Sequence, residues 1–449
     1  MRVVLAPAGS RGDFQPLLAL GLGLRAAGHD VVMATSPSFV AEVRAFGLEA
    51  RTVGLDAEAF VRESGFAASP LAATYDLFKI GRAKVREMIV EGLPLMRGAD
   101  VVVGAGAQIA APTIAEALGV PYVFVAYTPQ ALWSSHHPPF TFPLHGLPRF
   151  ANRALWRAFS VMTGAVFAGP INAERCRLGL APVHRWYEHF FPPSAILLAS
   201  DPELAGPAPD SFLAVPPTGA LHLPDTRPLS AELERFLAAG PPPVYVGFGS
   251  MPDKRPAETT RLIVAAARSA GARLVLSRGW AGFGAHDAGA GRATKQAGEP
   301  LAGGESALGA DVFVAGPSSH ALLFPRVAAV VHHGGAGTTA ASARAGRPQV
   351  VIPHIFDQFQ WARWVHAAGL APPPLARGRL TGGRLVVALS AVLREASYRT
   401  SAHEVGAKLR SRDSTADAIA AIEKLTRTGP SEGRVVVEDR QEQVTSIER

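Results

Sequence analysis

Two short segments combine small residues with side chains that could do chemistry, and each follows an apolar run of strand length. In the segment 330–351, such a run leads into two histidines and a Gly-Gly-Ala-Gly-Thr-Thr stretch before a helical pattern starts. Glycines there would let a phosphate approach the backbone, and N–H groups at a helix start attract negative charge. The segment matches neither the Walker pattern nor the dinucleotide fingerprint. It predicts an anion site, with a tight strand-to-helix turn as the alternative.

The second segment, residues 6–16, places Gly9, Ser10, Arg11 and Asp13 directly after the first apolar run. A helix is expected to begin near Gln15. Asp13 would then project from the carboxyl edge of a parallel sheet, where such folds bind ligands. A helix start would lower the pKa of its carboxyl unless an apolar ligand desolvated it. The alternative role for Asp13 is a helix N-cap.

A third turn, residues 246–252, carries Gly249 and Ser250 and is a weak signal by itself. Asp357 and Gln358 form a carboxylate and amide pair after another apolar run. Such a pair suits hydrogen bonding to vicinal sugar hydroxyls, and an N-cap is again the alternative.

Metal ligands are scarce in this chain. Cys176 is the one cysteine, and no Asp-x-Asp sequence occurs. The adjacent histidine pairs at 136–137 and 332–333 have no third ligand at metal spacing. We therefore expect no metal and no cofactor.

The stretch 101–148 predicts a lining for an apolar ligand. Glu116 is its one charged side chain. Its later part is rich in proline and irregular, so its aromatic side chains are candidates for a pocket or for ordinary core. The segment 186–193 is a candidate for the opposite wall. The acceptor-side candidates are Tyr127, Trp133, Phe140 and Phe142.

Apolar runs alternate with helical patterns along most of the 449 residues, which predicts an α/β protein with two doubly wound parallel sheets. Expected strands are 2–6, 30–34, 50–53, 101–104, 121–126 and 195–199 in the first half, and 244–248, 273–277, 311–315, 328–332 and 349–352 in the second. We divide the chain into a domain at 1–220, a Pro-rich linker at 221–243, a domain at 244–400, closing helices at 401–426 and a polar tail at 427–449.

The composition narrows the class of protein. Hydrophobic residues make up 48% and charged residues 18% of the chain, which is a globular balance. The net charge of +7 comes from the second half, which suits an anionic ligand there, but no basic run indicates nucleic-acid binding. We expect no signal peptide, no transmembrane span and at most peripheral membrane contact. The single cysteine fits a cytoplasmic location.

Four segments in this order resemble family 1 glycosyltransferases of the GT-B architecture, in the branch of sterol, glycopeptide and polyketide glycosyltransferases. These segments are GSRGDFQP near the start, INAERCRLGL at 171–180, ALLFPRVAAVVHHGGAGTT at 321–339 and PHIFDQ at 353–358. The resemblance covers nearly all of 1–425. Two departures from the plant members stand out, Asp13 in place of a catalytic His and Ala341 in place of an acidic ribose ligand.

The resemblance implies two facing Rossmann-like domains and an inverting transfer of a hexose to a lipophilic hydroxyl acceptor, with UDP-glucose favoured over a dTDP-sugar. It implies that Asp13 is the general base and that Asp357 and Gln358 hold the sugar. The remaining donor-side residues that it implies are Ser10, Arg11, Ser250, Trp280, Pro317, His320, His333, Ala336, Gly337 and Thr338.

Two other functions compete with this hypothesis. An oxidoreductase would need a glycine fingerprint after a strand, but the glycines at 21–28 lie inside a helical pattern. A non-catalytic nucleotide-sugar-binding partner of another transferase would not need Asp13. The expected partners are thus a nucleotide sugar and a lipophilic small molecule.

Overall fold

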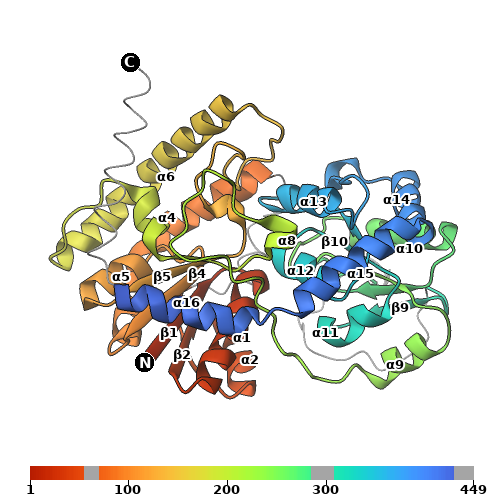
Figure 1. Ribbon diagram of the computed structural model, residues 1–449, viewed down its shortest axis with the longest axis horizontal. Coiled ribbons are helices and arrows are strands. Elements are labelled where there is room, and N and C mark those ends of the chain that lie inside the picture. The colour runs from red at the N-terminus through yellow and green to blue at the C-terminus, as the bar shows by residue number, and fades with distance from the viewer. Residues whose placement is uncertain (55–69, 285–307, 429–449) are drawn as a thin grey trace, which may run out of the picture.

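The computed structural model describes residues 1–54, 70–284 and 308–428, arranged as two α/β halves side by side (Figure 1). Nearly all of the predicted polar tail and most of a Gly/Ala-rich segment at 281–310 lie outside the described residues.

The first half is built on a six-stranded parallel sheet. Its central strand β1 pairs with β2 and β4, so that Val3 lies opposite both Val31 and Val101. Because these strands are buried on both faces, their sequences are continuous apolar runs rather than alternating patterns. The spatial order is β3 (Glu49–Thr52), β2 (Asp30–Thr35), β1 (Arg2–Ala8), β4 (Val101–Gly106), β5 (Tyr122–Ala126) and β6 (Ile196–Leu198).

The second half holds a five-stranded parallel sheet. Its order is β11 (Gln349–Val351), β10 (Ala329–His332), β7 (Val244–Gly247), β8 (Leu274–Ser277) and β9 (Val312–Ala315). Each of the eleven apolar runs predicted as a strand is a strand here, which confirms two doubly wound parallel sheets.

Helices connect and cover the strands of each half. In the first they are α1 (Arg11–Ala26), α2 (Val40–Ala45), α4 (Pro70–Met96), α5 (Ala111–Leu118), α6 (Arg149–Arg177), α7 (Trp186–Phe190) and α8 (Pro202–Ala205). In the second they are α9 (Ala231–Ala238), α10 (Pro256–Ser269), α11 (His320–Leu323), α12 (Ala336–Arg344), α13 (Gln358–Ala367), α14 (Gly382–Arg394) and α15 (Ala396–Arg410), followed by α16 (Ser414–Thr428).

Three helix boundaries differ from the prediction. The helix α1 starts at Arg11 rather than near Gln15, because Ser10 is its N-cap. The Pro-rich linker contains α9, whose start is capped by Ser230. The closing helices predicted at 401–426 begin earlier, at Ala396, and α15 and α16 are separated where Asp413 Oδ1 accepts a hydrogen bond from the backbone N–H of Ala416.

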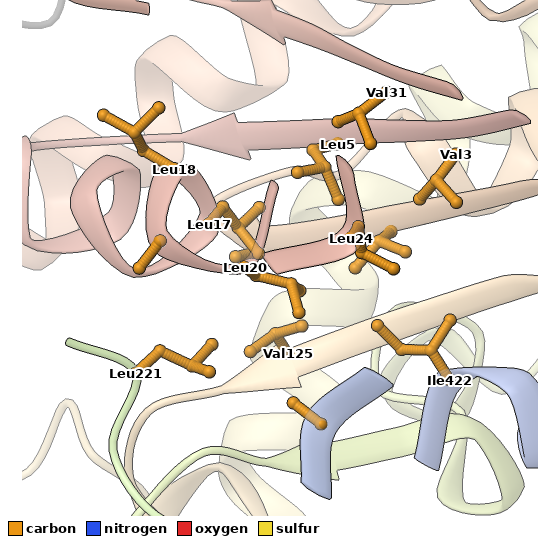
Figure 2. Close-up of a cluster of buried hydrophobic side chains, with 14 of the residues drawn as sticks. Val3, Leu5, Leu17, Leu18, Leu20, Leu24, Val31, Val125, Leu221 and Ile422 are labelled. Carbon is orange, nitrogen blue, oxygen red and sulfur yellow. The ribbon is translucent and has the colours of Figure 1, made fainter. Parts of the chain in front are cut away.

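The chain crosses twice between the halves, and the second crossing ends on α16. Arg412 in this crossing donates to both carboxylate oxygens of Glu203 at 3.0 and 2.9 Å. The helix α16 then packs on α1, and Figure 2 shows Ile422 among side chains of α1 and the first sheet. Gly23 of α1 leaves room for Thr415, since a Cβ there would collide with it. The last helix thus belongs to the core of the first half.

Ile422→Ala should therefore destabilise the first half. Ile422 is fully buried, and removing such a side chain costs about 2–5 kcal/mol through lost transfer energy and the cavity left behind. Denaturant unfolding of the variant measures this cost. Ala420→Ser, an exposed position on the same helix, is the control and should change stability by no more than about 0.7 kcal/mol. Equal effects of the two variants would show that α16 is only loosely attached.

Candidate active site

The carboxyl ends of both sheets face one cleft of about 3540 Å³ between the two halves. Small-molecule pockets usually enclose about 300–1,000 Å³, so this cleft has room for two ligands at once. Asp13, His333 and Asp357 all line it, although they are far apart in the sequence. The turns that follow β1, β10 and β11 thus meet in space.

Asp13 lies in the first turn of α1 and not at its N-cap, so the N-cap alternative is wrong. Its Oδ2 accepts hydrogen bonds from the backbone N–H of Ser10 at 2.8 Å and from Ser10 Oγ at 3.2 Å, in a capping box. No described residue donates to Oδ1. Gly106 at the end of β4 makes room for that oxygen, because a Cβ there would lie 2.8 Å from it. One carboxylate oxygen is thus fixed by Ser10, and the other lies beside Gly106 without a hydrogen-bond donor among the described residues.

Burial raises the pKa of Asp13 from 3.8 to about 6, although the hydrogen bonds from Ser10 act in the opposite direction. The expected lowering by the helix start is therefore wrong, because loss of solvent outweighs it. Burial, with the charge of Asp13 adding to it, also raises the pKa of Asp357, to about 7. Both shifts favour the protonated carboxyls. The stabilisation of the folded state that comes from Asp13 and Asp357 is therefore fully present below about pH 4, and it is lost as the pH rises through 6 to 7.

The start of α12 lies where the sequence predicts an anion site. Its N-cap is Gly335, which offers no side-chain acceptor to the first N–H groups of the helix. Ser10, Ser230, Ser319 and Thr381 do cap the helices that follow them. The uncapped start of α12 opens into the cleft, with Ala336, Gly337 and Thr338 lining it. Such a start attracts an anion through its N–H groups and the helix dipole.

The two adjacent histidines have different surroundings. His332 is buried, accepts a hydrogen bond from the backbone N–H of Gly334 and contacts Gln349 Oε1 at 2.7 Å, so it shapes the turn. His333 lines the cleft, and its buried Nδ1 has no hydrogen-bond partner among the described residues. Burial holds the pKa of His333 well below its usual range. His333 is thus a neutral side chain with an unused hydrogen-bonding atom.

Asp357 and Gln358 follow β11 at the start of α13. Asp357 is the N-cap residue of α13, as the alternative predicted, but its side chain makes no capping hydrogen bond. Its Oδ2 instead accepts a hydrogen bond from Trp361 Nε1 at 3.1 Å. Gln358 Oε1 accepts from the backbone N–H groups of His354 and Ile355 at 2.9 and 3.1 Å. Gln358 therefore braces the loop before α13 as well as lining the cleft.

An aromatic chamber occupies the part of the cleft in the first half. Tyr127 and Phe140 line it, and Tyr127 Oη donates to the backbone carbonyl of Asp13 at 2.9 Å. Trp133 and Phe142 are not among the lining residues, and the side chain of Trp133 is 45% exposed. The predicted opposite wall is present, since α7 and the residues after it line the chamber. The chamber's aromatic residues outside β5 and its loop are Phe78, Phe159, Phe167, Trp186, Tyr187, Phe190 and Phe191.

The remaining donor-side candidates all line the cleft, and several already have protein partners. Arg11 pairs with Glu42 at 2.8 Å, and Ser10 Oγ accepts from the backbone N–H of Gly12. His320 is stacked on Phe324, and burial lowers the pKa of its imidazole to about 4. The others are Ser250, Trp280 and Pro317.

Several lining residues were missed by the sequence analysis, among them Arg278 and Phe356. Arg278 follows β8, and its buried Nε has no hydrogen-bond partner among the described residues. A lone arginine after a strand was the only signal for it. Phe356, from the second half, contacts the ring of Phe140 from the first half, with 6.3 Å between centroids. No signal in the sequence marked Phe356.

Phe356 adopts a φ of 51°, the one positive φ among the described non-glycine residues. A bulky side chain in this region is strained by about 1–3 kcal/mol. The loop keeps this conformation because Gln358 Oε1 holds the two preceding backbone N–H groups. The strained residue lies between Asp357 and the aromatic chamber and so connects the two parts of the cleft.

Phe356→Gly should be more stable than Phe356→Ala by about 1 kcal/mol. Both variants lose the ring, but only glycine adopts a positive φ without a steric cost. Denaturant unfolding measures the difference. At the exposed helical position Val387 the order should be reversed, with alanine about 1 kcal/mol more stable than glycine. Phe356→Ala matching or exceeding the stability of Phe356→Gly would show that the loop is not strained.

Two family models match parts of the chain. The Glycosyltransferase family 28 N-terminal domain matches residues 3–134. The C-terminal domain of Erythromycin biosynthesis protein CIII-like proteins matches residues 307–425. These two regions contain Asp13 and the segment from the predicted anion site to Gln358.

Curated relatives cover most of the chain. It is 37% identical to a vancomycin aglycone glucosyltransferase of Amycolatopsis orientalis, over 82% of this chain and 85% of that protein. It is 36% identical to a dTDP-epi-vancosaminyltransferase of the same organism, over 80% of each chain. A sterol 3-beta-glucosyltransferase of Arabidopsis thaliana is 30% identical, over 94% of this chain and 65% of that protein.

Solved structures share the architecture at low sequence identity. The glycosyltransferase VinC in complex with dTDP superposes with a TM-score of 0.64 at 19% identity, over 96% of this chain and all of that one. Spinosyn forosaminyltransferase SpnP gives a TM-score of 0.63 at 20% identity, over 95% and 99% of the two chains. Two parallel sheets facing one cleft, together with the curated relatives, show that this chain belongs to the GT-B glycosyltransferases.

Proposed function

We propose that this glycosyltransferase moves a hexose, with inversion, from a nucleoside-diphosphate sugar to a hydroxyl of a lipophilic acceptor, and that Asp13 is the general base. The observation that carries the proposal is the position of Asp13. Its Oδ1 accepts no hydrogen bond from a described residue, and Asp13 lines a cleft that has an uncapped helix start in one half and an aromatic chamber in the other. This arrangement brings an anionic donor and an apolar acceptor to one carboxylate.

The donor's diphosphate would bind at the start of α12. The N–H groups of Ala336, Gly337 and Thr338 would receive its charge, as helix starts commonly do for phosphates. His333 would complete this site as a neutral hydrogen-bond donor through its unpartnered Nδ1. Ser250, at the turn after β7, lines the same region. We infer that Trp280, Pro317 and His320 border the nucleoside.

In the reaction, the acceptor oxygen would attack the anomeric carbon while Asp13 takes the hydroxyl proton. The bond from that carbon to the phosphate oxygen breaks, and its electron pair leaves with the nucleoside diphosphate. The N–H groups at the start of α12 stabilise the charge that develops there. Because burial raises the pKa of Asp13 to about 6, its carboxylate is a stronger base than an exposed one and is still ionised at pH 7.

We infer that Asp357 holds the sugar, together with the amide nitrogen of Gln358. Among the described residues, only Oδ2 of Asp357 has a hydrogen-bond partner, so Oδ1 is available to hydroxyl groups. Gln358 Oε1 is already occupied by two backbone N–H groups, and Nε2 donates to Met251 Sδ at 3.4 Å, which leaves its second N–H for a sugar hydroxyl. The charge of Asp13 contributes to the raised pKa of Asp357, which supports a position of this pair near the proposed base.

Glucose is the sugar we favour, and uridine the nucleoside, with a dTDP-sugar as the second candidate. The names of the glycopeptide and plant relatives include two glucosyltransferases, whereas another relative is named for a dTDP-sugar. The aromatic chamber supports a sterol-like or polyketide acceptor. Cys176 is a free thiol, and a cytoplasmic location suits it.

Asp13→Asn should lower kcat by about 10²-fold or more with donor affinity nearly unchanged, because the amide cannot accept the proton. Its oxygen can still accept the hydrogen bond from the Ser10 N–H, so the fold should persist. The measurement is the steady-state transfer rate with an acceptor on which the wild type is active. Asp201→Asn removes another buried carboxylate, outside the cleft, and should leave the rate near that of the wild type. Unchanged turnover of Asp13→Asn would make Asp13 a structural residue only.

Asp357→Ala should weaken binding of UDP-glucose by about 1–3 kcal/mol, because sugar hydroxyls lose a buried partner. Binding of free UDP should barely change, since the nucleotide does not reach this residue. Calorimetric titration with each ligand measures both affinities, and the thymidine pair replaces them if the protein prefers it. Gln360→Ala, two residues after Gln358 on α13, is the control. Equal losses for UDP and UDP-glucose would remove Asp357 from the sugar site.

A further inference from the structure

The helix α6 has two apolar faces that point to different surroundings. One face is buried against the first half, and its Phe159, Thr163 and Phe167 line the aromatic chamber. The opposite face is open, with Phe150 75% and Val161 73% exposed and Met162 also exposed. Soluble helices normally present polar side chains on the outer face, so this pattern is unusual.

The exposed residues follow helical spacing. Phe150, Ala154, Ala158, Val161 and Ala165 recur every three or four residues, and each is exposed. At about 100° per residue they form one stripe along the helix. The stripe is therefore a continuous apolar surface rather than a few scattered exposed side chains.

Basic side chains border one side of this stripe. Arg149, Arg153 and Arg157 are spaced by four residues and are exposed, and no ion pair joins them to a carboxylate anywhere in the described chain. The sequence 149–173 contains no Asp or Glu. The α6 surface, which we define as Phe150, Val161, Met162 and these three arginines, thus combines an apolar stripe with uncompensated positive charge.

By length and composition alone, α6 could also cross a membrane, in contrast to the expectation that no such stretch is present. Its packing argues for a different arrangement. The helix lies along α4. Because Pro170 has no N–H, the carbonyl of Val166 lacks its helical partner, and Arg82 of α4 donates a hydrogen bond to that carbonyl at 2.6 Å. The inner face of α6 is thus fixed to the protein, and only the outer face is free to contact lipid.

We propose that the α6 surface docks the protein on an anionic lipid bilayer, with α6 parallel to the membrane plane. An apolar stripe bordered by arginines is the composition of interfacial helices, in which apolar side chains enter the lipid and cations bind anionic headgroups. Docking would bring the aromatic chamber, on the other side of the same helix, next to the phase in which a lipophilic acceptor dissolves. The benefit of bringing the chamber to the lipid rests on the acceptor class in the proposed function, whereas the docking of α6 on the bilayer does not.

Vesicle flotation of the full chain tests the proposal without any substrate. We expect binding to vesicles of 70% phosphatidylcholine and 30% phosphatidylglycerol at 0.1 M NaCl, and much weaker binding to phosphatidylcholine alone or at 1 M NaCl. Each arginine near an anionic surface contributes about fivefold, so Arg153→Glu/Arg157→Glu should lower the partition coefficient at least about tenfold. Phe150→Ser/Val161→Ser should lower it to a comparable extent.

Matched variants elsewhere provide the control. Val90→Ser/Val387→Ser changes two valines that are 59% and 70% exposed on other helices and should bind vesicles like the wild type. Circular dichroism confirms that each variant is folded. The proposal is overturned if wild type fails to bind anionic vesicles, or if the α6 variants bind as well as the control. It is also overturned if light scattering shows a dimer that the α6 variants abolish, since the surface would then join two copies of this chain. Loss of transfer activity with vesicle binding intact would count only against the proposed function.

Discussion

The removal of the Asp13 carboxylate from solvent is the constraint on which the rest of the site depends. Ser10 holds Oδ2 with two hydrogen bonds that favour the ionised form, yet burial outweighs them and raises the pKa of Asp13 to about 6. Gly9 and Gly106 enclose the carboxylate, since a Cβ at either position would collide with it, and the second half lies across the cleft. The two crossings between the halves, with Arg412 bound to Glu203 and α16 in the core of the first half, keep this arrangement in place.

Two of the helix starts at the cleft, those of α1 and α12, differ in how their first N–H groups are satisfied. The start of α1 is closed by its own capping box, so its N–H groups are satisfied within the protein. The start of α12 has no side-chain cap, and beside it His333 is neutral with an unpartnered nitrogen. In the proposed function, the donor's phosphates would therefore bind at the start of α12, in the half opposite Asp13. Phe356 joins the two regions from a strained backbone.

Much of the fold could be predicted from the sequence because buried parallel strands read as continuous apolar runs. The start of α1 was misplaced because Ser10 and Asp13 also fit a turn before the helix, and only their reciprocal hydrogen bonds show the capping box. Aromatic composition predicted a chamber, but it could not tell which side chains face inward, and Trp133 lies at the surface. Phe356 could not have been found, because a positive φ at a phenylalanine depends on the tertiary contacts around Gln358. The raised pKa of Asp13 likewise depends on its burial in the folded protein, which no local sequence pattern shows.

Titration of the Asp13 carboxyl by carbon-13 NMR, in protein labelled at aspartate, tests this central claim most directly. The Asp13 resonance is the one that disappears from the spectrum of Asp13→Asn. The account predicts a midpoint near pH 6, since burial raises the pKa of this group to about 6. A midpoint at or below the ordinary value of 3.8 would contradict it, because the helix start and Ser10 would then outweigh burial and leave Asp13 a weak base.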